Sequence, residues 1–166
     1  MRLFRIVAVM AVIWVTSEVI YQLTYRPLAC NRIKNRVQTV ALEMWDRPDE
    51  PSVARRAREG IAAMRQCIAV SPTDPDMYMT LAVNERLIGR LADAAATYRQ
   101  ALRYDRRPEL FYNLGMVLLE MNQRESAALA FTEACKFDLN FANRIPDPAL
   151  VETIVTAVRA RQAARQ

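Results

Sequence analysis

The sequence predicts an all-α fold built from stacked antiparallel helical hairpins, and three observations lead to this prediction. Residues 78–105 and 111–138 carry one pattern twice, displaced by 33 positions, and such a period is typical of stacked supersecondary units. Apolar residues make up 52% of the chain and Gly only 3 of 166 residues, a composition that suits helices. Strand signals are nearly absent, because no alternating run of Val, Ile or Thr is bounded by turn residues.

Residues 1–29 are predicted to form an N-terminal transmembrane or signal-anchor helix with a juxtamembrane segment. Residues 3–25 are mostly apolar and contain no Pro or Gly, and as a helix they would reach about 34 Å, enough to cross a bilayer core. Glu18, Tyr21, Tyr25 and Arg26 are expected at the membrane interface. Glu18 falls near the far third of this apolar span, where a carboxylate is costly unless it snorkels, is protonated or finds a partner.

Two other interpretations of this segment stay open. A cleaved secretory signal fits the basic start and short apolar core, although Thr16-Ser17-Glu18-Val19 offers no small-x-small cleavage site. A lipoprotein signal at Leu28-Ala29-Cys30 is weakened by the preceding Pro27 and by an apolar core that ends too early.

Charges flanking the segment do not decide its orientation. Arg2 and Arg5 stand at its start, and a second group follows it: Arg26, Arg32, Lys34 and Arg36. A very short basic start usually stays cytoplasmic, which would put the remainder in a periplasm. Only 2 of the 23 basic residues are Lys, a bias that indicates a GC-rich bacterial genome. We therefore expect a single-pass protein of a bacterial inner membrane with its soluble domain on the periplasmic side.

Residues 30–74 are predicted to form the first, degenerate hairpin. Its first helix covers roughly residues 31–45, and its second carries Gly60, Met64 and Cys67, which lie 34 positions before Ala94, Tyr98 and Ala101. Because the turn near residues 47–51 lies midway between Cys30 and Cys67, both cysteines should lie at the open end of this hairpin. A disulfide between them is one interpretation, and two unpaired thiols are the other.

Residues 75–144 carry the two clear copies of the pattern. In each first helix an aromatic, Leu and a small residue share one stripe: Tyr78, Leu81 and Ala82, then Phe111, Leu114 and Gly115. Gly89 and Asn122 fall at the chain reversals and tolerate a left-handed backbone. The second helices match in the same way: Ala94, Tyr98 and Ala101, then Ala127, Phe131 and Ala134.

These residues resemble the tetratricopeptide repeat (TPR) family, whose pattern is an aromatic, Leu-Gly, Ala, an aromatic and Ala. The match is strong from Phe111-Tyr112-Asn113-Leu114-Gly115 onward, and it extends at lower similarity over about residues 31–140. Arg106 and Leu139 stand where the family usually has Pro. The resemblance implies a right-handed solenoid of helical hairpins.

Residues 145–166 should form a C-terminal capping helix after the break at Ile145-Pro146-Asp147-Pro148. Asp147 is a candidate N-cap, and Pro148 suits the first helical position. One apolar stripe follows and should cover the last hairpin: Leu150, Val151, Ile154, Val155 and Val158.

Catalytic signals are weak, and we expect neither enzyme activity nor a cofactor or metal. The chain has no His, and each of its three Gly is explained by the repeat. A net charge of +5 admits nucleic-acid binding, but basic residues do not cluster with aromatics. Arg55, Arg56 and Arg58 are better explained as a solvated helix face, with anionic lipid or an acidic partner as the next interpretation.

The family resemblance implies that first helices line a concave groove. Its predicted partner-binding residues are Met79, Val83, Arg86, Tyr112, Met116 and Leu119. This apolar, adaptable set suits an apolar peptide or an amphipathic helix, although Met116 and Leu119 could also belong to the core. The predicted function is a membrane-anchored adaptor for protein partners; the alternative is an accessory structural subunit of a membrane protein complex with residues 3–25 in its interface.

Overall fold

The computed structural model describes residues 2–46 and 50–163, without the side chains of residues 2–6, 8, 45 and 162. The described residues form α-helices, one π-helical turn and one 3-10 helix, with no strand among them. In chain order these elements are α1 (Arg2–Ile20), the π-helical turn (Tyr21–Tyr25), α2 (Arg26–Trp45), α3 (Val53–Val70), α4 (Pro75–Leu87), α5 (Leu91–Ala101), α6 (Pro108–Glu120), α7 (Arg124–Phe137), the 3-10 helix (Leu139–Arg144) and α8 (Pro148–Ala163).

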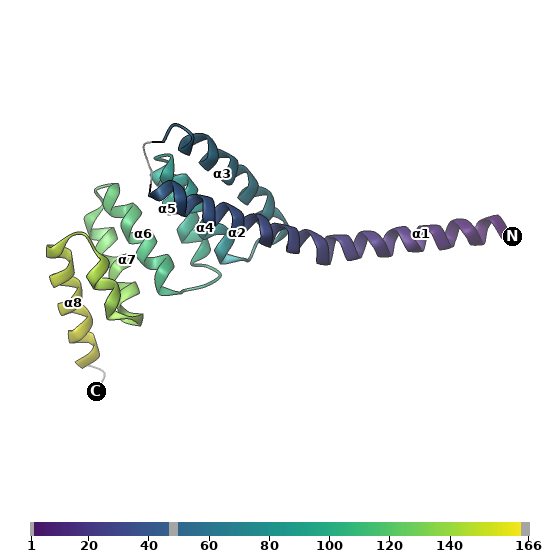
Figure 1. The fold of residues 1–166 in the computed structure, drawn as a ribbon. Helices are drawn as coiled ribbons and strands as arrows, with labels where there is room; N and C mark the ends of the chain where they lie inside the picture. Colours follow the sequence, from purple (N-terminus) through teal and green to yellow (C-terminus); the bar gives the residue numbers. More distant parts are fainter. Residues whose placement is uncertain (1, 47–49, 164–166) are drawn as a thin grey trace.

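Three helical hairpins stack one after another along the chain. Within each hairpin α2 packs on α3, α4 on α5, and α6 on α7, while α4 also contacts α2 and α3, and α6 contacts α5. Helix α8 packs on α7 at one end of the stack, and α1 projects from the other end (Figure 1). The all-α prediction is therefore confirmed, and the arrangement is consistent with a TPR-type solenoid.

The two clear copies of the pattern adopt the same local structure. Gly89 and Asn122 both have positive φ angles, 74° and 58°, at the reversals between the paired helices. Tyr78 stacks on Tyr104 with ring centroids 5.6 Å apart, and the corresponding Phe111 stacks on Phe137 at 6.4 Å. Residues 33 positions apart in the sequence thus make equivalent contacts in the two hairpins.

The core is continuous from α4 to α8 but divided in the first hairpin. The matched alanines are fully buried, which lets neighbouring helices approach closely, and they are Ala94, Ala101, Ala127 and Ala134. The α2–α3 hairpin instead buries two small clusters, one around Met64 and Cys67 and one around Met44 and Ala57. Smaller clusters bury less apolar area, which agrees with the weaker sequence pattern there.

The amino-terminal region is one uninterrupted helical rod rather than two separate elements. Helix α2 begins at Arg26, not near residue 31, and the π-helical turn joins it to α1. Pro27 explains this turn, because proline lacks an N–H and its ring clashes with the carbonyl four residues earlier. The wider turn relieves the clash, and the Arg26 N–H bonds to the carbonyl of Tyr21.

The predicted transmembrane helix over residues 3–25 is not supported. Within the described part of the chain no helix combines the length and apolar character that crossing a bilayer requires. The α-helical stretch ends at Ile20, and the side chains of residues 3–6 and 8 lie outside the described set. The partner sought for Glu18 is in its own helix: Gln22 donates to Glu18, and Arg26 donates to Gln22, both at 2.6 Å.

The carboxyl-terminal helix α8 begins where the sequence indicated. Asp147 accepts hydrogen bonds from the backbone N–H groups of Ala149 and Leu150, at 3.1 and 3.3 Å. Leu150, Ile154 and Val158 are buried in the core that α4 to α7 also share. Helix α8 therefore covers the apolar end of the α6–α7 hairpin.

Candidate functional site

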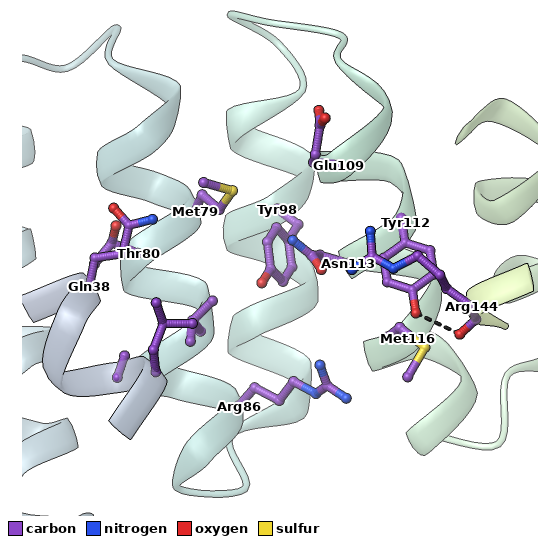
Figure 2. Close-up of a pocket in the computed structure, with 13 residues that line it drawn as sticks. Gln38, Met79, Thr80, Arg86, Tyr98, Glu109, Tyr112, Asn113, Met116 and Arg144 are labelled. Atoms are coloured by element: carbon purple, nitrogen blue, oxygen red, sulfur yellow. Dashed lines mark hydrogen bonds between the residues drawn. The ribbon is translucent and has the colours of Figure 1, made fainter. Parts of the chain in front are cut away.

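A groove runs across the layer formed by the first helices of the three hairpins. Its cavity measures about 480 Å³ and lies between α2, α4 and α6 (Figure 2). The lining comes from all three hairpins: Gln38, Ala41 and Leu42 of α2, Met79, Thr80, Val83 and Arg86 of α4, Tyr98 of α5, Glu109, Tyr112, Asn113 and Met116 of α6, and Arg144.

The middle of the groove is apolar. Met79, Val83 and Met116 line it and are only partly buried, although they also pack on the core clusters. Tyr98 lies behind them and is 1% exposed, and burial raises the pKa of its phenol, so the hydroxyl stays protonated. Apolar surface that no other side chain covers in a concave site favours an apolar ligand group over water.

An ion pair at Arg86, which lines the groove, joins two of its helices. Arg86 of α4 donates from Nε to both carboxylate oxygens of Glu120 at 3.0 Å, which joins α4 to α6. The Arg86 side chain is 11% exposed and that of Glu120 is 40% exposed, so water reaches the carboxylate side of this pair and screens it in part. Arg86 therefore helps to hold the spacing of the two helices that carry the apolar residues.

Tyr112 belongs to the core as much as to the groove. It is 9% exposed, and its ring lies 5.7 Å from Phe131 and 5.5 Å from Phe141. Its hydroxyl donates to the carbonyl of Arg144 at 2.8 Å, as Figure 2 shows. Tyr112, which we predicted to bind a partner, lines the groove, and its ring is packed from both sides so that it also supports the groove wall.

The other predicted groove residues divide in a simple way. Met79, Val83, Arg86 and Met116 line the cavity together with Tyr112, as the sequence led us to expect. Leu119 does not line it and instead packs on the main core. This difference follows from helix geometry, because Leu119 is rotated by about 60° from the direction of Met116 and faces the next element.

The groove has two contributions from outside the two clear hairpins that the sequence did not predict, besides Thr80, Tyr98, Glu109 and Asn113 within them. Helix α2 supplies Gln38, Ala41 and Leu42, although its hairpin lacks the Leu-Gly signature. Arg144 arrives from the 3-10 helix, where its guanidinium stacks 4.8 Å from the Tyr112 ring centroid. The weaker pattern of α2 gave no signal for the first group, and no local pattern indicates Arg144.

The predicted cysteine pair does come together, as free thiols. Cys30 and Cys67 are both buried, and neither is in a disulfide. The basic residues of α3 are partly neutralised by neighbours: Arg55 contacts Glu59 at 2.8 Å and Arg56 contacts Glu43 at 3.2 Å. Such pairing is what a solvated helix face would show.

Comparison with known families supports the fold. The tetratricopeptide repeat family model matches residues 108–141, which cover α6, α7 and the start of the 3-10 helix. No curated protein matches the chain. Residues 108–141 therefore match the tetratricopeptide pattern, and the two hairpins before them have the same helix–turn–helix arrangement. Proteins of this family are generally non-enzymatic scaffolds for protein interactions.

Proposed function

We propose that this chain is a non-enzymatic scaffold that binds a protein partner in the groove between α2, α4 and α6. The observation that carries the proposal is the apolar middle of the 480 Å³ cavity, where Met79, Val83 and Met116 stay partly accessible. Covering these side chains with an apolar partner group would be favourable by about 25 cal/mol for each Å² removed from water.

The chemistry of the lining suits an apolar peptide or an amphipathic helix. Methionine side chains are flexible and polarisable, so Met79 and Met116 can adapt to differently shaped apolar groups. Glu109 and Arg144 add charges of opposite sign to the lining. A partner with an apolar stripe flanked by complementary charges would use all of these features.

The proposal has a second part, which concerns location. The described side chains of α1 are exposed, and many are large and apolar, including Met10, Val12 and Trp14, which are 62%, 61% and 68% exposed. Contiguous exposed apolar surface favours contact with a membrane or another protein. We propose attachment at a bacterial inner membrane, with the repeats on the periplasmic side.

A second candidate function rests on the same helix. The chain would be an accessory structural subunit of a membrane protein complex, and α1 would pack against another subunit. Glu18 separates the two candidates. Replacement by Leu removes only the bond from Gln22 in a simple attachment helix, whereas it would remove an intersubunit partner in a complex.

Charge insertion in the groove tests the first proposal. Met79→Glu and Met116→Glu each put a carboxylate into the apolar middle, where an unpaired charge is costly to desolvate. We expect each variant to lower partner affinity at least about tenfold, which corresponds to about 1.4 kcal/mol. A partner would first be identified by crosslinking at Met79 in native membranes. Its binding to each variant would then be measured by titration with purified proteins.

Leu129→Glu provides the matched control. Leu129 is 70% exposed on α7, outside the groove, so the same added charge should leave binding unchanged. Circular dichroism would establish equal helicity for all three variants. Normal binding by both groove variants, together with weakened binding by the control, would place the contact on the outer layer and end the groove proposal.

Alkaline carbonate extraction tests the location. A chain that stays in the membrane fraction with its intact amino terminus, checked by mass, supports attachment through α1. Recovery in the soluble fraction contradicts it. If Glu18→Leu keeps membrane retention but abolishes co-purification of other chains, the subunit candidate is favoured over the adaptor.

A further inference from the structure

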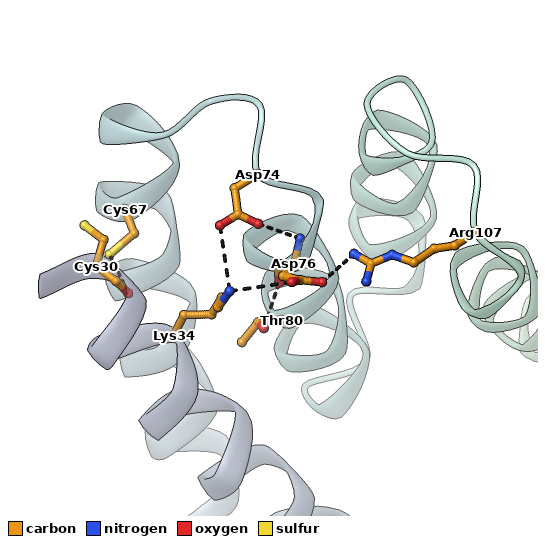
Figure 3. Close-up of polar contacts among 7 residues, drawn as sticks. All are labelled: Cys30, Lys34, Cys67, Asp74, Asp76, Thr80 and Arg107. Carbon is orange, nitrogen blue, oxygen red and sulfur yellow. Dashed lines mark hydrogen bonds and ion pairs between the residues drawn. The ribbon is translucent and has the colours of Figure 1, made fainter. Parts of the chain in front are cut away.

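Two thiols meet at the open end of the first hairpin, away from the groove. Cys30 lies near the start of α2 and Cys67 near the end of α3, with exposed fractions of 7% and 1%. The Cys67 sulfur is 3.9 Å from the carbonyl oxygen of Cys30. Figure 3 shows the two side chains next to one another between the helices. Both thiols are free, and the groove does not use either of them.

The surroundings of this pair leave room for a small reagent. A cavity of about 560 Å³ is lined by Cys30 and Cys67 together with Tyr25, Arg26 and Gln66, among others. Burial, followed by the neighbouring Cys30 thiol, raises the pKa of Cys67 to about 12. A thiol with a raised pKa is a poor leaving group, and such a pair favours the disulfide over the dithiol more than a low-pKa pair does.

We propose that Cys30 and Cys67 are a site of disulfide formation, and that the bond fastens α2 to α3. The oxidant is a low-molecular-weight disulfide. The Cys30 thiolate attacks one of its sulfurs and releases one thiolate, which leaves a mixed disulfide on Cys30. The Cys67 thiolate then attacks the Cys30 sulfur and releases the second thiolate. Two protons from the cysteines end on the two released thiols, and the small disulfide gains the two electrons.

The position of the pair gives the bond a structural consequence. One turn after Cys30, Lys34 lies 3.7 Å from Asp74 and 3.6 Å from Asp76 at the start of α4, and its side chain is 11% exposed. Asp76 also pairs with Arg107, just before α6, as Figure 3 shows. The bond would thus hold α2 beside this chain of ion pairs, which links the three first helices.

Oxidation of the full-length protein tests the proposal. Reduced protein is incubated with oxidised glutathione, and free thiols, intact mass and the crosslinked peptides are measured. We expect two of the three cysteines to be consumed, a loss of mass equal to two hydrogen atoms, and one peptide pair that joins Cys30 to Cys67. Cys135→Ser should behave like the wild type. Cys67→Ser should instead keep glutathione on Cys30.

Two results would overturn the assignment. One is three free thiols under conditions that oxidise a dithiol peptide, and the other is a bond that includes Cys135. If the Cys67 variant does not fold, binding of phenylarsine oxide to the reduced wild type replaces it, because this reagent needs two adjacent thiols. Failure to bind would contradict the pairing. Neither assay requires a partner, so these results are independent of the groove proposal.

The rate and the local stability provide further checks. Closure of the mixed disulfide should accelerate as the pH rises from 7 to 9, since burial raises the pKa of Cys67 and its thiolate fraction therefore grows over this range. Hydrogen exchange of α2 amides should slow on oxidation, while α6 and α7 stay unchanged. Equal protection of α2 in both redox states would show that the bond does not hold this helix.

Discussion

Gly115 offers the most direct test of how the repeat packs. A Cβ built on this residue would lie 2.6 and 2.7 Å from two atoms of the Phe131 ring and 3.0 Å from a third. Phe131 is fully buried, and the ring of Tyr112 is 5.7 Å away from it, centroid to centroid. Replacement by Ala therefore forces the ring to retreat by about 0.8 Å to reach ordinary van der Waals contact.

The expected effect of Gly115→Ala is a difference between two terms. Overpacking of a tight core costs about 1–3 kcal/mol, whereas Ala in place of Gly within a helix contributes about 1 kcal/mol of stability. We expect the clash to dominate, with a net loss of about 1 kcal/mol. For a chain of this size that loss lowers the melting temperature by about 2–4 °C.

Urea unfolding with thermal melts is the assay. The urea midpoint should fall while the slope of the transition is unchanged, since the exposed surface of unfolding stays the same. A double variant with Phe131→Leu should lose less stability than the sum of the single changes, because the smaller side chain makes room for the added methyl. A higher melting temperature for Gly115→Ala, as helix propensity alone predicts, would refute the reasoning.

Three further predictions follow from single sites. Gly89 has φ 74° with open space around its Cβ position, so Gly89→Ala should cost about 1 kcal/mol of stability through backbone strain alone. Gly89→Asn should lose less stability in the same melts, because Asn122 adopts this conformation. Tyr112→Phe removes the donor to the Arg144 carbonyl and should cost about 1 kcal/mol in urea unfolding, while Tyr112→Ala should cost about 3–5 kcal/mol through the cavity it leaves. Burial raises the pKa of Glu85 above its ordinary 4.5, although the hydrogen bonds from Thr97 and Arg65 act in the opposite direction. Folding therefore favours the protonated carboxyl, and the stability of the wild type relative to Glu85→Gln should be greatest below about pH 4.5 and fall as pH rises through the folded pKa. A stability difference that stays constant between pH 4 and 8 would contradict this.

Tertiary contacts give some of the predicted groove residues a role in the core. The resemblance placed Tyr112 and Leu119 among partner-binding residues, but the sequence does not contain the position of the 3-10 helix. That helix brings Phe141 against Tyr112 and an acceptor to its hydroxyl. A side chain that would be a ligand contact on an isolated hairpin thereby becomes part of the core.

The amino-terminal rod shows the same dependence on context. The apolar character of residues 3–25 predicted a helix, and α1 is helical over Arg2–Ile20. Whether that helix ends before α2 depends on how the backbone accommodates Pro27, and the π-helical turn lets it continue. The continuous rod then carries α2 into the groove as a wall, which no residue of the weaker hairpin pattern predicted.

By itself the sequence determined the features that depend on neighbours close in the chain. The helical periods, the reversals at Gly89 and Asn122, the cap at Asp147 and the register of the two clear hairpins all follow from local backbone and side-chain preferences. Only the tertiary structure decided which helices meet across the groove, how Arg86 reaches Glu120, and which aromatic rings are enclosed. The physical reason is that local preferences fix the direction of each side chain on its own helix, whereas contact between helices depends on the packing of residues more than thirty positions apart.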